Sequence, residues 1–306
     1  MARSNDPRVA STARLRVALA AAFAWASLAT SSACAEGIAR HSFAWHRGEA
    51  GQWLLALTVE PEAGWHVYWE NPGDSGDAPR FEFSLPPGWH AGATVYPRPE
   101  ATMIDDAPFY GYLGRVTYLV PVAPAEGLGA QPPNSGEWSV TARVMACKER
   151  CTVTSCSARG AWPPSPAGAE IALRGGAVGG ASLPLTAEQA KVEARITDGR
   201  VRIEGPAQGA SSVRFIPSNV PGMLVDLPEG QAAIPGTVEG GRFRLEFPLR
   251  HPGEGDGQPA VAGLVLLGNR PGDPCVRLAV PRAAPAAAPS PPADIPGASP
   301  AQPPAK

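Results

Sequence analysis

Beyond its first 35 residues, the sequence has no hydrophobic run long enough to cross a bilayer. The strongest later candidate, residues 260–267, has only the length of a strand. Amphipathic helical patterns are nearly absent as well, and residues 185–194 are the one moderate helix candidate. No basic stripe is present, which argues against nucleic acid as a partner. The mature chain is therefore predicted to lack a membrane span.

The first 35 residues predict a secretion signal. They begin with a basic region and continue with an apolar stretch, residues 17–29, that is too short to span a bilayer. Ala33-Cys34-Ala35 fits the A-x-A cleavage pattern, so we expect cleavage before Glu36. A lipoprotein site at Cys34 is the alternative, and Ser31 disfavours it. Removing residues 1–35 takes away four Arg and Asp6, so the formal net charge changes from −2 to −5.

Proline and glycine, with 36 and 34 residues, lie between short alternating apolar runs, which is the pattern of a turn-rich β protein. Residues 52–60 place four apolar side chains on one face of a strand: Trp53, Leu55, Leu57 and Val59. Further strands are predicted at residues 65–69, 80–83, 116–122 and 138–146, and residues 71–76 are predicted to form a turn. The sequence predicts an all-β fold that begins with an immunoglobulin-like β-sandwich.

A Pro/Gly/Ala-rich stretch near residues 162–182 separates these strands from a second set. The second set begins near residue 191 and includes residues 242–247, where apolar and charged side chains alternate as in a strand with one wet face. Residues 282–306 are mostly Pro, Ala and Ser and are expected to be a disordered tail. The predicted organisation is a signal peptide (1–35), a β-sandwich (36–165), a linker (166–184), a second, smaller β-rich domain (185–281) and the tail (282–306).

Four cysteines remain after the predicted cleavage, and sequence alone leaves their three complete pairings open. Cys147 and Cys151 are close enough to face each other across a tight turn. Strand parity places Cys147 on the face opposite the apolar residues of strand 138–146. Lys148 and Arg150 would favour the reactive thiolate, whereas Glu149 would oppose it.

Three interpretations of this cysteine pair stay open on spacing alone. The first is thiol–disulfide exchange, and the second is a structural disulfide in a noncatalytic binding module. The third is copper handling through Met145, Cys147 and Cys151. The five histidines show no ligand spacing around the cysteines, so no metal ligands are assigned, and no organic cofactor is expected.

Four segments, taken in order, resemble one family. They are GWHVYWENPGDSG at residues 64–76, DDAPFYGY at 105–112, LVPV at 119–122 and CKERC at 147–151. Together they resemble the periplasmic N-terminal domain of the thiol:disulfide interchange protein DsbD, in particular the ScsB-like branch. The resemblance covers roughly residues 38–165.

The resemblance implies an immunoglobulin-like sandwich with a redox-cycling pair, here Cys147 and Cys151, in a periplasmic component of a protein-disulfide reductase system. It implies an electron donor that is membrane-embedded or thioredoxin-like, and an acceptor that is a periplasmic disulfide isomerase or other oxidoreductase. It also implies an aromatic cap over the pair. The residues that match the cap and the aromatic positions near it are Asp106, Phe109, Tyr110, Trp65 and Tyr68.

The sequence also departs from the family pattern. No electron-carrying membrane segment and no thioredoxin-like C-x-x-C motif follows the sandwich, so the chain is expected either to obtain electrons from a separate protein or to serve another purpose. Cys156 is an extra thiol that could compete with the predicted pair, and Cys275 could bond to Cys156 or stay free. The direction of electron flow, the oligomeric state and the role of the second domain are left open.

Overall fold

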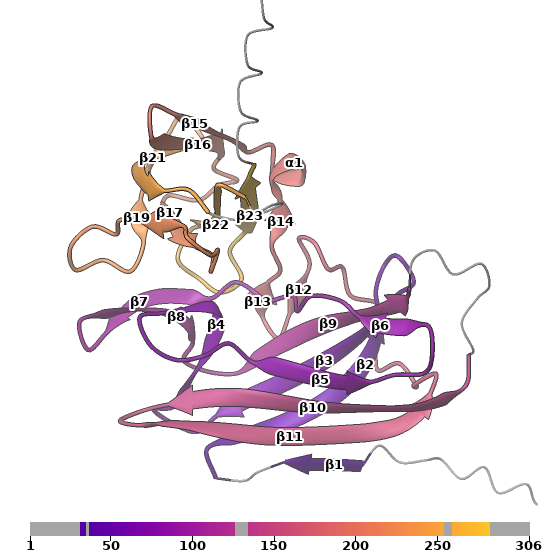
Figure 1. The fold of residues 1–306 in the computed structure, drawn as a ribbon. Coiled ribbons are helices and arrows are strands. Elements are labelled where there is room, and N and C mark those ends of the chain that lie inside the picture. The colour runs from indigo at the N-terminus through magenta and orange to yellow at the C-terminus, as the bar shows by residue number, and fades with distance from the viewer. Residues whose placement is uncertain (1–30, 35–36, 126–133, 254–258, 282–306) are drawn as a thin grey trace, which may run out of the picture.

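The computed structural model describes residues 31–34, 37–125, 134–253 and 259–281, which form two β-sandwiches (Figure 1). Most of the predicted signal peptide and the predicted tail lie outside these ranges. Within the signal segment, Ser31–Cys34 forms β1, which pairs with β11 and places Cys34 opposite Cys156 in the ladder. The predicted all-β class is confirmed, because nearly every described element is a strand.

The first sandwich is built from two antiparallel sheets that face each other (Figure 1). Their inner faces enclose an aromatic cluster in which Trp45 makes edge-to-face contacts with Trp53, Trp138 and Trp162. The larger sheet contains β1, β11 (Cys151–Trp162), β10 (Gly136–Cys147), β4 (His66–Gly73), β8 (Ala107–Tyr112) and β7 (Glu100–Ile104), with β5 (Arg80–Ser84) also paired to β10. The smaller sheet contains β2 (Ala39–Arg47), β3 (Trp53–Pro61), β9 (Val116–Pro124) and β6 (Trp89–Ala91).

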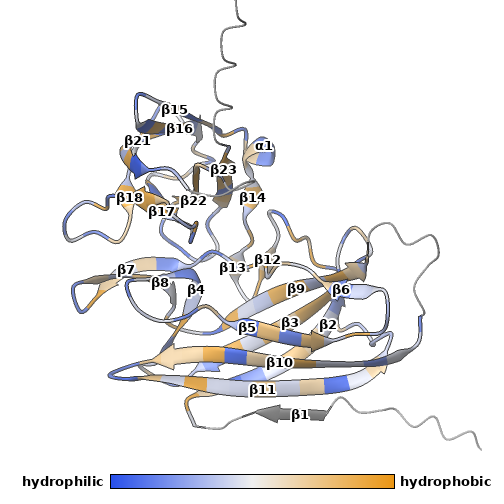
Figure 2. Ribbon diagram, in the orientation of Figure 1, coloured by the Kyte–Doolittle hydropathy of each residue, from blue (hydrophilic) through white to orange (hydrophobic). Residues whose placement is uncertain are grey.

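Strand β10 shows why the larger sheet has one dry face and one mixed face. Val140, Ala142 and Val144 are buried between the sheets, whereas the side chains between them are partly or fully exposed. Figure 2 shows hydrophobic and hydrophilic bands alternating along β10. Because successive side chains of a strand point to opposite faces, this pattern orients the whole strand.

The predicted linker, residues 166–184, packs onto the outer face of the smaller sheet. It includes the short pair β12 (Ala177–Val178) and β13 (Ala181–Ser182). Leu183 is buried against Ala56 and Leu119, which point away from the sandwich core. This packing accounts for the nearly continuous apolar sequences of β3 and β9, since both faces of these strands are covered.

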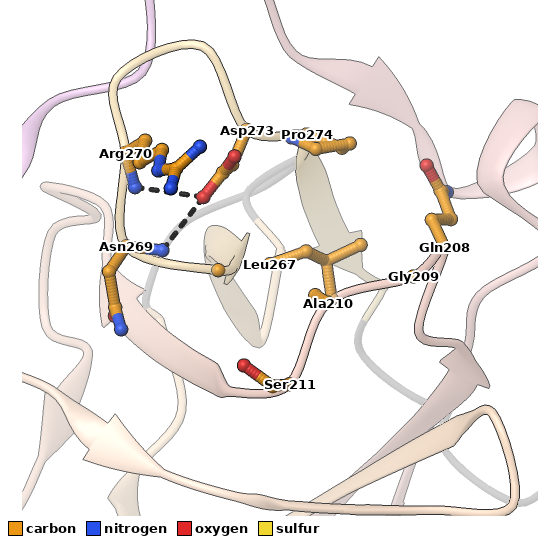
Figure 3. Close-up of a pocket in the computed structure, with 10 residues that line it drawn as sticks. Gln208, Gly209, Ala210, Ser211, Leu267, Asn269, Arg270, Asp273 and Pro274 are labelled. Atoms are coloured by element: carbon orange, nitrogen blue, oxygen red, sulfur yellow. Dashed lines mark hydrogen bonds between the residues drawn. The ribbon is translucent and has the colours of Figure 1, made fainter.

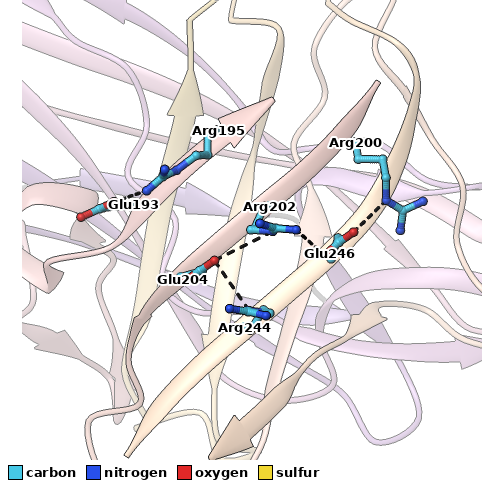
Figure 4. Close-up of polar contacts among 7 residues, drawn as sticks. All are labelled: Glu193, Arg195, Arg200, Arg202, Glu204, Arg244 and Glu246. Atoms are coloured by element: carbon cyan, nitrogen blue, oxygen red, sulfur yellow. Dashed lines mark hydrogen bonds and ion pairs between the residues drawn. The ribbon is translucent and has the colours of Figure 1, made fainter. Parts of the chain in front are cut away.

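The second sandwich also has two facing sheets, which enclose a cluster of aliphatic and aromatic residues around the stacked rings of Phe215 and Phe247. One sheet contains β14 (Leu185–Thr186), β23 (Cys275–Val280), β22 (Val261–Leu267), β17 (Val213–Pro217) and β19 (Ile234–Pro235). The other contains β15 (Glu193–Thr197), β16 (Arg200–Pro206), β21 (Arg242–His251), β18 (Leu224–Val225) and β20 (Thr237–Glu239). Its exposed face carries cross-strand ion pairs, including Arg200 with Glu246 at 2.8 Å (Figure 4).

Two local predictions are corrected. The helix expected at residues 185–194 is a single turn, α1 (Ala187–Ala190), with a capping box between Thr186 and Gln189. It ends because Lys191 adopts a left-handed conformation, and the chain then enters β15. The turn expected from residue 71 begins later, because Asn71 is still in β4. The side chain of Asn71 accepts a hydrogen bond from the N–H of Gly73 and donates one to the carbonyl of Pro217 in the second sandwich.

The two sandwiches share a hydrophobic core. Tyr96, Tyr112 and Tyr118 of the first sandwich belong to the same buried cluster as Ile216 and Leu264 of the second. Polar contacts accompany this core, such as the ion pair of Glu70 with Arg277 at 2.7 Å. Since apolar surface of each sandwich is covered by the other, the two are expected to stabilise each other.

Arg98 is the most deeply buried charged residue at this junction, with 3% of its surface exposed. Its guanidinium donates hydrogen bonds to the backbone carbonyls of Leu267, Pro274 and Gly268 at 3.2, 2.8 and 2.6 Å. It therefore satisfies three carbonyls of the second sandwich from a residue of the first.

We predict that Arg98→Met lowers the free energy of unfolding by about 3 kcal/mol, because three carbonyls lose a charged donor. Arg80→Met is the matched control, since Arg80 is exposed and forms an exposed ion pair with Asp77, and we expect a loss of no more than about 1 kcal/mol. Urea titration followed by tryptophan fluorescence measures both. Equal losses for the two variants would contradict this account of the junction.

Candidate functional site

The candidate site lies at the end of the long hairpin formed by β10 and β11. Cys147 and Cys151 are the last residue pair of this ladder, and a disulfide joins them across the turn Lys148-Glu149-Arg150. The structure thus chooses this pair among the pairings that the sequence left open. Cys156 lies further along β11, is disulfide-bonded and bonds to neither of these two cysteines. Cys275 is a buried free thiol, so it is not the partner of Cys156.

The two bonded cysteines have very different access to solvent. Cys147 is on the face of β10 opposite the sandwich core, as strand parity predicts, yet only 3% of its surface is exposed. Cys151 is exposed. The disulfide therefore presents one sulfur-bearing residue to the surroundings and keeps the other covered.

Phe109 of β8 supplies the cover. It forms a buried cluster with Tyr68 and Cys147 on the outer face of the larger sheet. Gly111 makes this position of the ring possible. A Cβ atom on Gly111 would stand 2.6 Å from the Phe109 ring and 2.2 Å from the carbonyl oxygen of Val67. The Phe-Tyr-Gly sequence thus lets the ring lie along its own strand.

The cap is a β-hairpin formed by β7 and β8. Its turn consists of Asp105 and Asp106, both with positive φ, as a two-residue turn of this kind requires. Asp106 is exposed at the tip of this turn. Tyr110, which the family resemblance also places in the cap, points the other way and belongs to the core shared by the two sandwiches. Phe109 therefore lies against the cysteine pair, whereas Tyr110 lies on the opposite face of β8.

Tyr68 lies beside Phe109, with ring centroids 5.7 Å apart. The segment after β4 folds over it, because Gly76 is so close that a Cβ atom there would stand 2.2 Å from the Tyr68 ring. Ser75 in the same segment hydrogen-bonds the Tyr68 hydroxyl, but burial is the larger effect and raises the pKa of Tyr68. The residues of the Gly-Asp-Ser-Gly sequence thus support an aromatic wall of the site.

His66 is a site residue that the sequence analysis did not select. It is directly opposite Cys147 in the ladder between β4 and β10, and 8% of its surface is exposed. Its ring stacks edge-to-face against Phe109 at 4.8 Å, and its Nε2 atom lies 3.2 Å from the Tyr68 hydroxyl. The signal was its place two residues before Tyr68, which puts both side chains on one face of a strand.

Trp65 and the charged turn of the hairpin line a cavity of about 490 Å³ next to the pair. Its other lining residues are Lys148, Glu149 and Arg150. Val153, two residues after Cys151, is an exposed apolar side chain, with 54% of its surface accessible. Cys151 is thus surrounded by a cavity, by side chains of both charges and by an exposed apolar side chain.

The family model "Thiol:disulfide interchange protein DsbD, N-terminal" matches residues 39–157. Those residues form a DsbD N-terminal-like domain. The match includes β2 to β10 and the first part of β11, and therefore the hairpin turn with both cysteines.

A solved structure, the N-terminal periplasmic domain of ScsB from Proteus mirabilis, is similar in fold to this chain. The TM-score is 0.52 at 14% sequence identity, and the match covers 84% of this chain and all of the ScsB domain. The similarity therefore extends past the DsbD N-terminal-like domain into the second sandwich. No curated protein matched the sequence.

Outside the DsbD N-terminal-like domain, a cavity with polar lining residues is a second candidate for a functional site. The second sandwich has a cavity of about 450 Å³. Among its lining residues in Figure 3, the carboxylate of Asp273 accepts hydrogen bonds from the N–H groups of Asn269 and Arg270. The Asp273 carboxylate is therefore occupied by hydrogen bonds within its own loop.

Within the described ranges, no three His, Cys, Asp or Glu residues gather as a metal site. No helix in the same ranges is long and apolar enough to cross a membrane.

We predict that the free thiol of Cys151 in Cys147→Ser reacts with iodoacetamide at least about tenfold faster than that of Cys147 in Cys151→Ser, because burial restricts access. Adding Phe109→Ala to Cys151→Ser should remove most of the difference. Mass spectrometry of tryptic peptides measures both rates. Cys275 is an internal control, since it has no exposed surface and should stay unmodified in the folded protein. Equal rates for the two single variants would contradict the cap.

Proposed function

We propose that this chain is a periplasmic relay of electron pairs that works by thiol–disulfide exchange at Cys147 and Cys151. The carrying observation is the asymmetric disulfide, with Cys151 exposed and Cys147 beneath Phe109, inside a DsbD N-terminal-like domain. The sandwich of residues 36–165 would carry the chemistry. Residues 185–281 would form the second domain, joined through the linker 166–184.

Exchange begins at Cys151, because an incoming thiolate can reach only the exposed sulfur. A thiolate of a reduced donor attacks Sγ of Cys151, the Cys147–Cys151 bond breaks, and Cys147 leaves as a thiolate that takes up a proton. The donor's second thiolate then attacks the donor sulfur in the mixed disulfide and releases Cys151. The donor ends as a disulfide and the pair as a dithiol, with two electrons and two protons transferred.

The reverse steps pass the electron pair to an oxidised partner. The reduced Cys151 attacks the partner's disulfide, and Cys147 then attacks Cys151 and releases the partner as a dithiol. We propose a membrane-embedded or thioredoxin-like protein as donor and a periplasmic disulfide isomerase or related oxidoreductase as acceptor. The cavity beside Trp65 and the exposed Val153 support a docking surface around Cys151.

Phe109 acts in this proposal as a shield against partners that are not specific. A small oxidant or a wrong thiol meets the exposed Cys151, but the second step needs Cys147, which the ring covers. In this proposal, Asp106 at the tip of the cap hairpin and Trp65 in the lining of the cavity contact a docking partner.

We predict a reduction potential above about −300 mV for the Cys147–Cys151 couple, since structural disulfides lie below that value. Equilibration with dithiol buffers of stepped potential, followed by acid quenching and thiol labelling, measures it. Cys147→Ser is the control that abolishes this transition and leaves any transition of Cys156. A potential well below that limit would make the bond structural and defeat the relay.

We also predict that Cys147→Ser accumulates a mixed disulfide with a partner through Cys151, because the resolving thiol is missing. Cys151→Ser should not trap one, since the remaining thiol is covered by Phe109. Non-reducing electrophoresis of periplasmic extracts, with mass spectrometry of the linked peptides, measures both outcomes. Equal trapping by the two variants would contradict the assignment of Cys151 as the attacking residue.

A further inference from the structure

His66 and Cys147 face each other across two neighbouring strands. They are a register pair in the antiparallel ladder of β4 and β10, so their side chains lie on the same face of the sheet with Cβ atoms about 5 Å apart. The Phe109 ring covers both, because it contacts the His66 ring and clusters with Cys147. The three residues, which have 8% or less of their surface exposed, therefore form one nearly buried group that we call the compartment.

Among the groups around Cys147, the imidazole of His66 is the one suited to act as a base. Tyr68, on the same strand, is the titratable neighbour that hydrogen-bonds Nε2 of His66 at 3.2 Å. Phe109 and Met145, from β8 and β10, carry no charge. The charged residues of the adjoining turns are exposed; they are Lys148, Glu149 and Arg150 in the hairpin β10–β11 and Asp105 and Asp106 in the hairpin β7–β8.

A covered cysteine creates a chemical requirement. Burial in apolar surroundings favours the neutral thiol over the thiolate, yet only the thiolate attacks a disulfide. Cys147 must therefore lose its proton inside the compartment before it can release a partner from Cys151. Burial also lowers the pKa of His66 below its ordinary value near 6.5, so the imidazole is neutral at neutral pH and can accept a proton.

We propose that His66 takes the proton of the Cys147 thiol when Cys147 resolves the mixed disulfide on Cys151. The S–H bond of Cys147 breaks as a ring nitrogen of His66 gains the proton. The Cys147 thiolate then attacks Sγ of Cys151, the bond between Cys151 and the partner breaks, and the partner leaves as a thiolate. The imidazolium returns the proton to that thiolate or to water. This step rests on the proposed relay function.

The test is the pH dependence of Cys147 reactivity in Cys151→Ser, where Cys147 is the site's single thiol. We expect His66→Gln to shift the apparent pKa of Cys147 upward and to slow its alkylation at neutral pH by about tenfold, the equivalent of one pKa unit. Ultraviolet absorbance of the thiolate gives the pKa independently of the alkylating reagent. His90→Gln is the matched control, since His90 is exposed on β6, and its pH profile should equal that of the parent.

A second variant keeps the proposal testable if His66→Gln does not fold. Tyr68→Phe retains the imidazole and the aromatic wall but removes the hydroxyl that holds Nε2. We expect it to shift the pH profile of Cys147 as well, by less than His66→Gln does. A merely structural His66 would alter thermal stability and leave the pH profile unchanged. An unchanged profile in the folded His66 or Tyr68 variant would overturn the proposal.

These measurements need no partner protein, so they separate this inference from the relay itself. A reduction potential in the range of structural disulfides would refute the relay. If the pKa of Cys147 still depended on His66, the acid–base pair would exist without its proposed use. A relay-like potential with an unchanged pH profile would refute the role of His66 and retain the relay.

Discussion

Successive side chains of β10 point to opposite faces of the larger sheet, and this alternation decides what each cysteine can do. The even-numbered residues from Trp138 to Ala146 face the core, so Cys147 at the end of the strand faces outward. A disulfide on the inner face would be packed between two sheets and out of reach of another protein. On the outer face, its accessibility depends on what else covers that face.

The cover comes from β8, a strand whose two faces serve different purposes. Phe109 lies over Cys147, while Tyr110 and Tyr112 enter the core that the second sandwich completes. Asn71 and Glu70 on the adjacent strand bond to Pro217, Ser218 and Arg277 of the second sandwich. The position of the cap is thereby linked to the packing between the sandwiches. This linkage is a structural reason for the second domain to accompany the first.

The polar groups of the site, the His66 imidazole and the Tyr68 hydroxyl, lie on the same outer face of the larger sheet as Cys147. His66 and Tyr68 are two residues apart on β4 and therefore point together toward the compartment under Phe109. Their hydrogen bond gives the imidazole a fixed partner in surroundings that exclude most water. The exposed Cys151 and the covered Cys147 are thus arranged in order from the surface inward, and His66 lies beside Cys147 on the neighbouring strand. Such an order suits a reaction in which the first attack is open to partners and the second is protected.

Much of the architecture could be predicted from the sequence, because strands leave a local pattern. The predicted strands at residues 52–60, 116–122 and 242–247 correspond to β3, β9 and β21, since alternation or continuous apolar character directly reflects burial. The turn of residues 148–150 and the outward parity of Cys147 followed in the same way. Local pattern also misled. The helix expected at residues 185–194 is cut short at both ends, because Leu185 and Thr186 pair with β23 and residues 193–194 pair with β16. Asn71 stays in β4, where its amide bonds the second sandwich.

The sequence by itself determined most strands, the short spacing of Cys147 and Cys151 and the motifs of the family resemblance, because each is written in residues that are neighbours along the chain. Only the tertiary structure decided that Cys147 is covered while Cys151 is exposed, that Phe109 and not Tyr110 forms the cover, and that His66 faces the pair. These three facts depend on β4, β8 and β10, which are separated by tens of residues along the chain. A side chain's burial on the outer face of a sheet is set by such distant strands, and no periodicity within one strand records it.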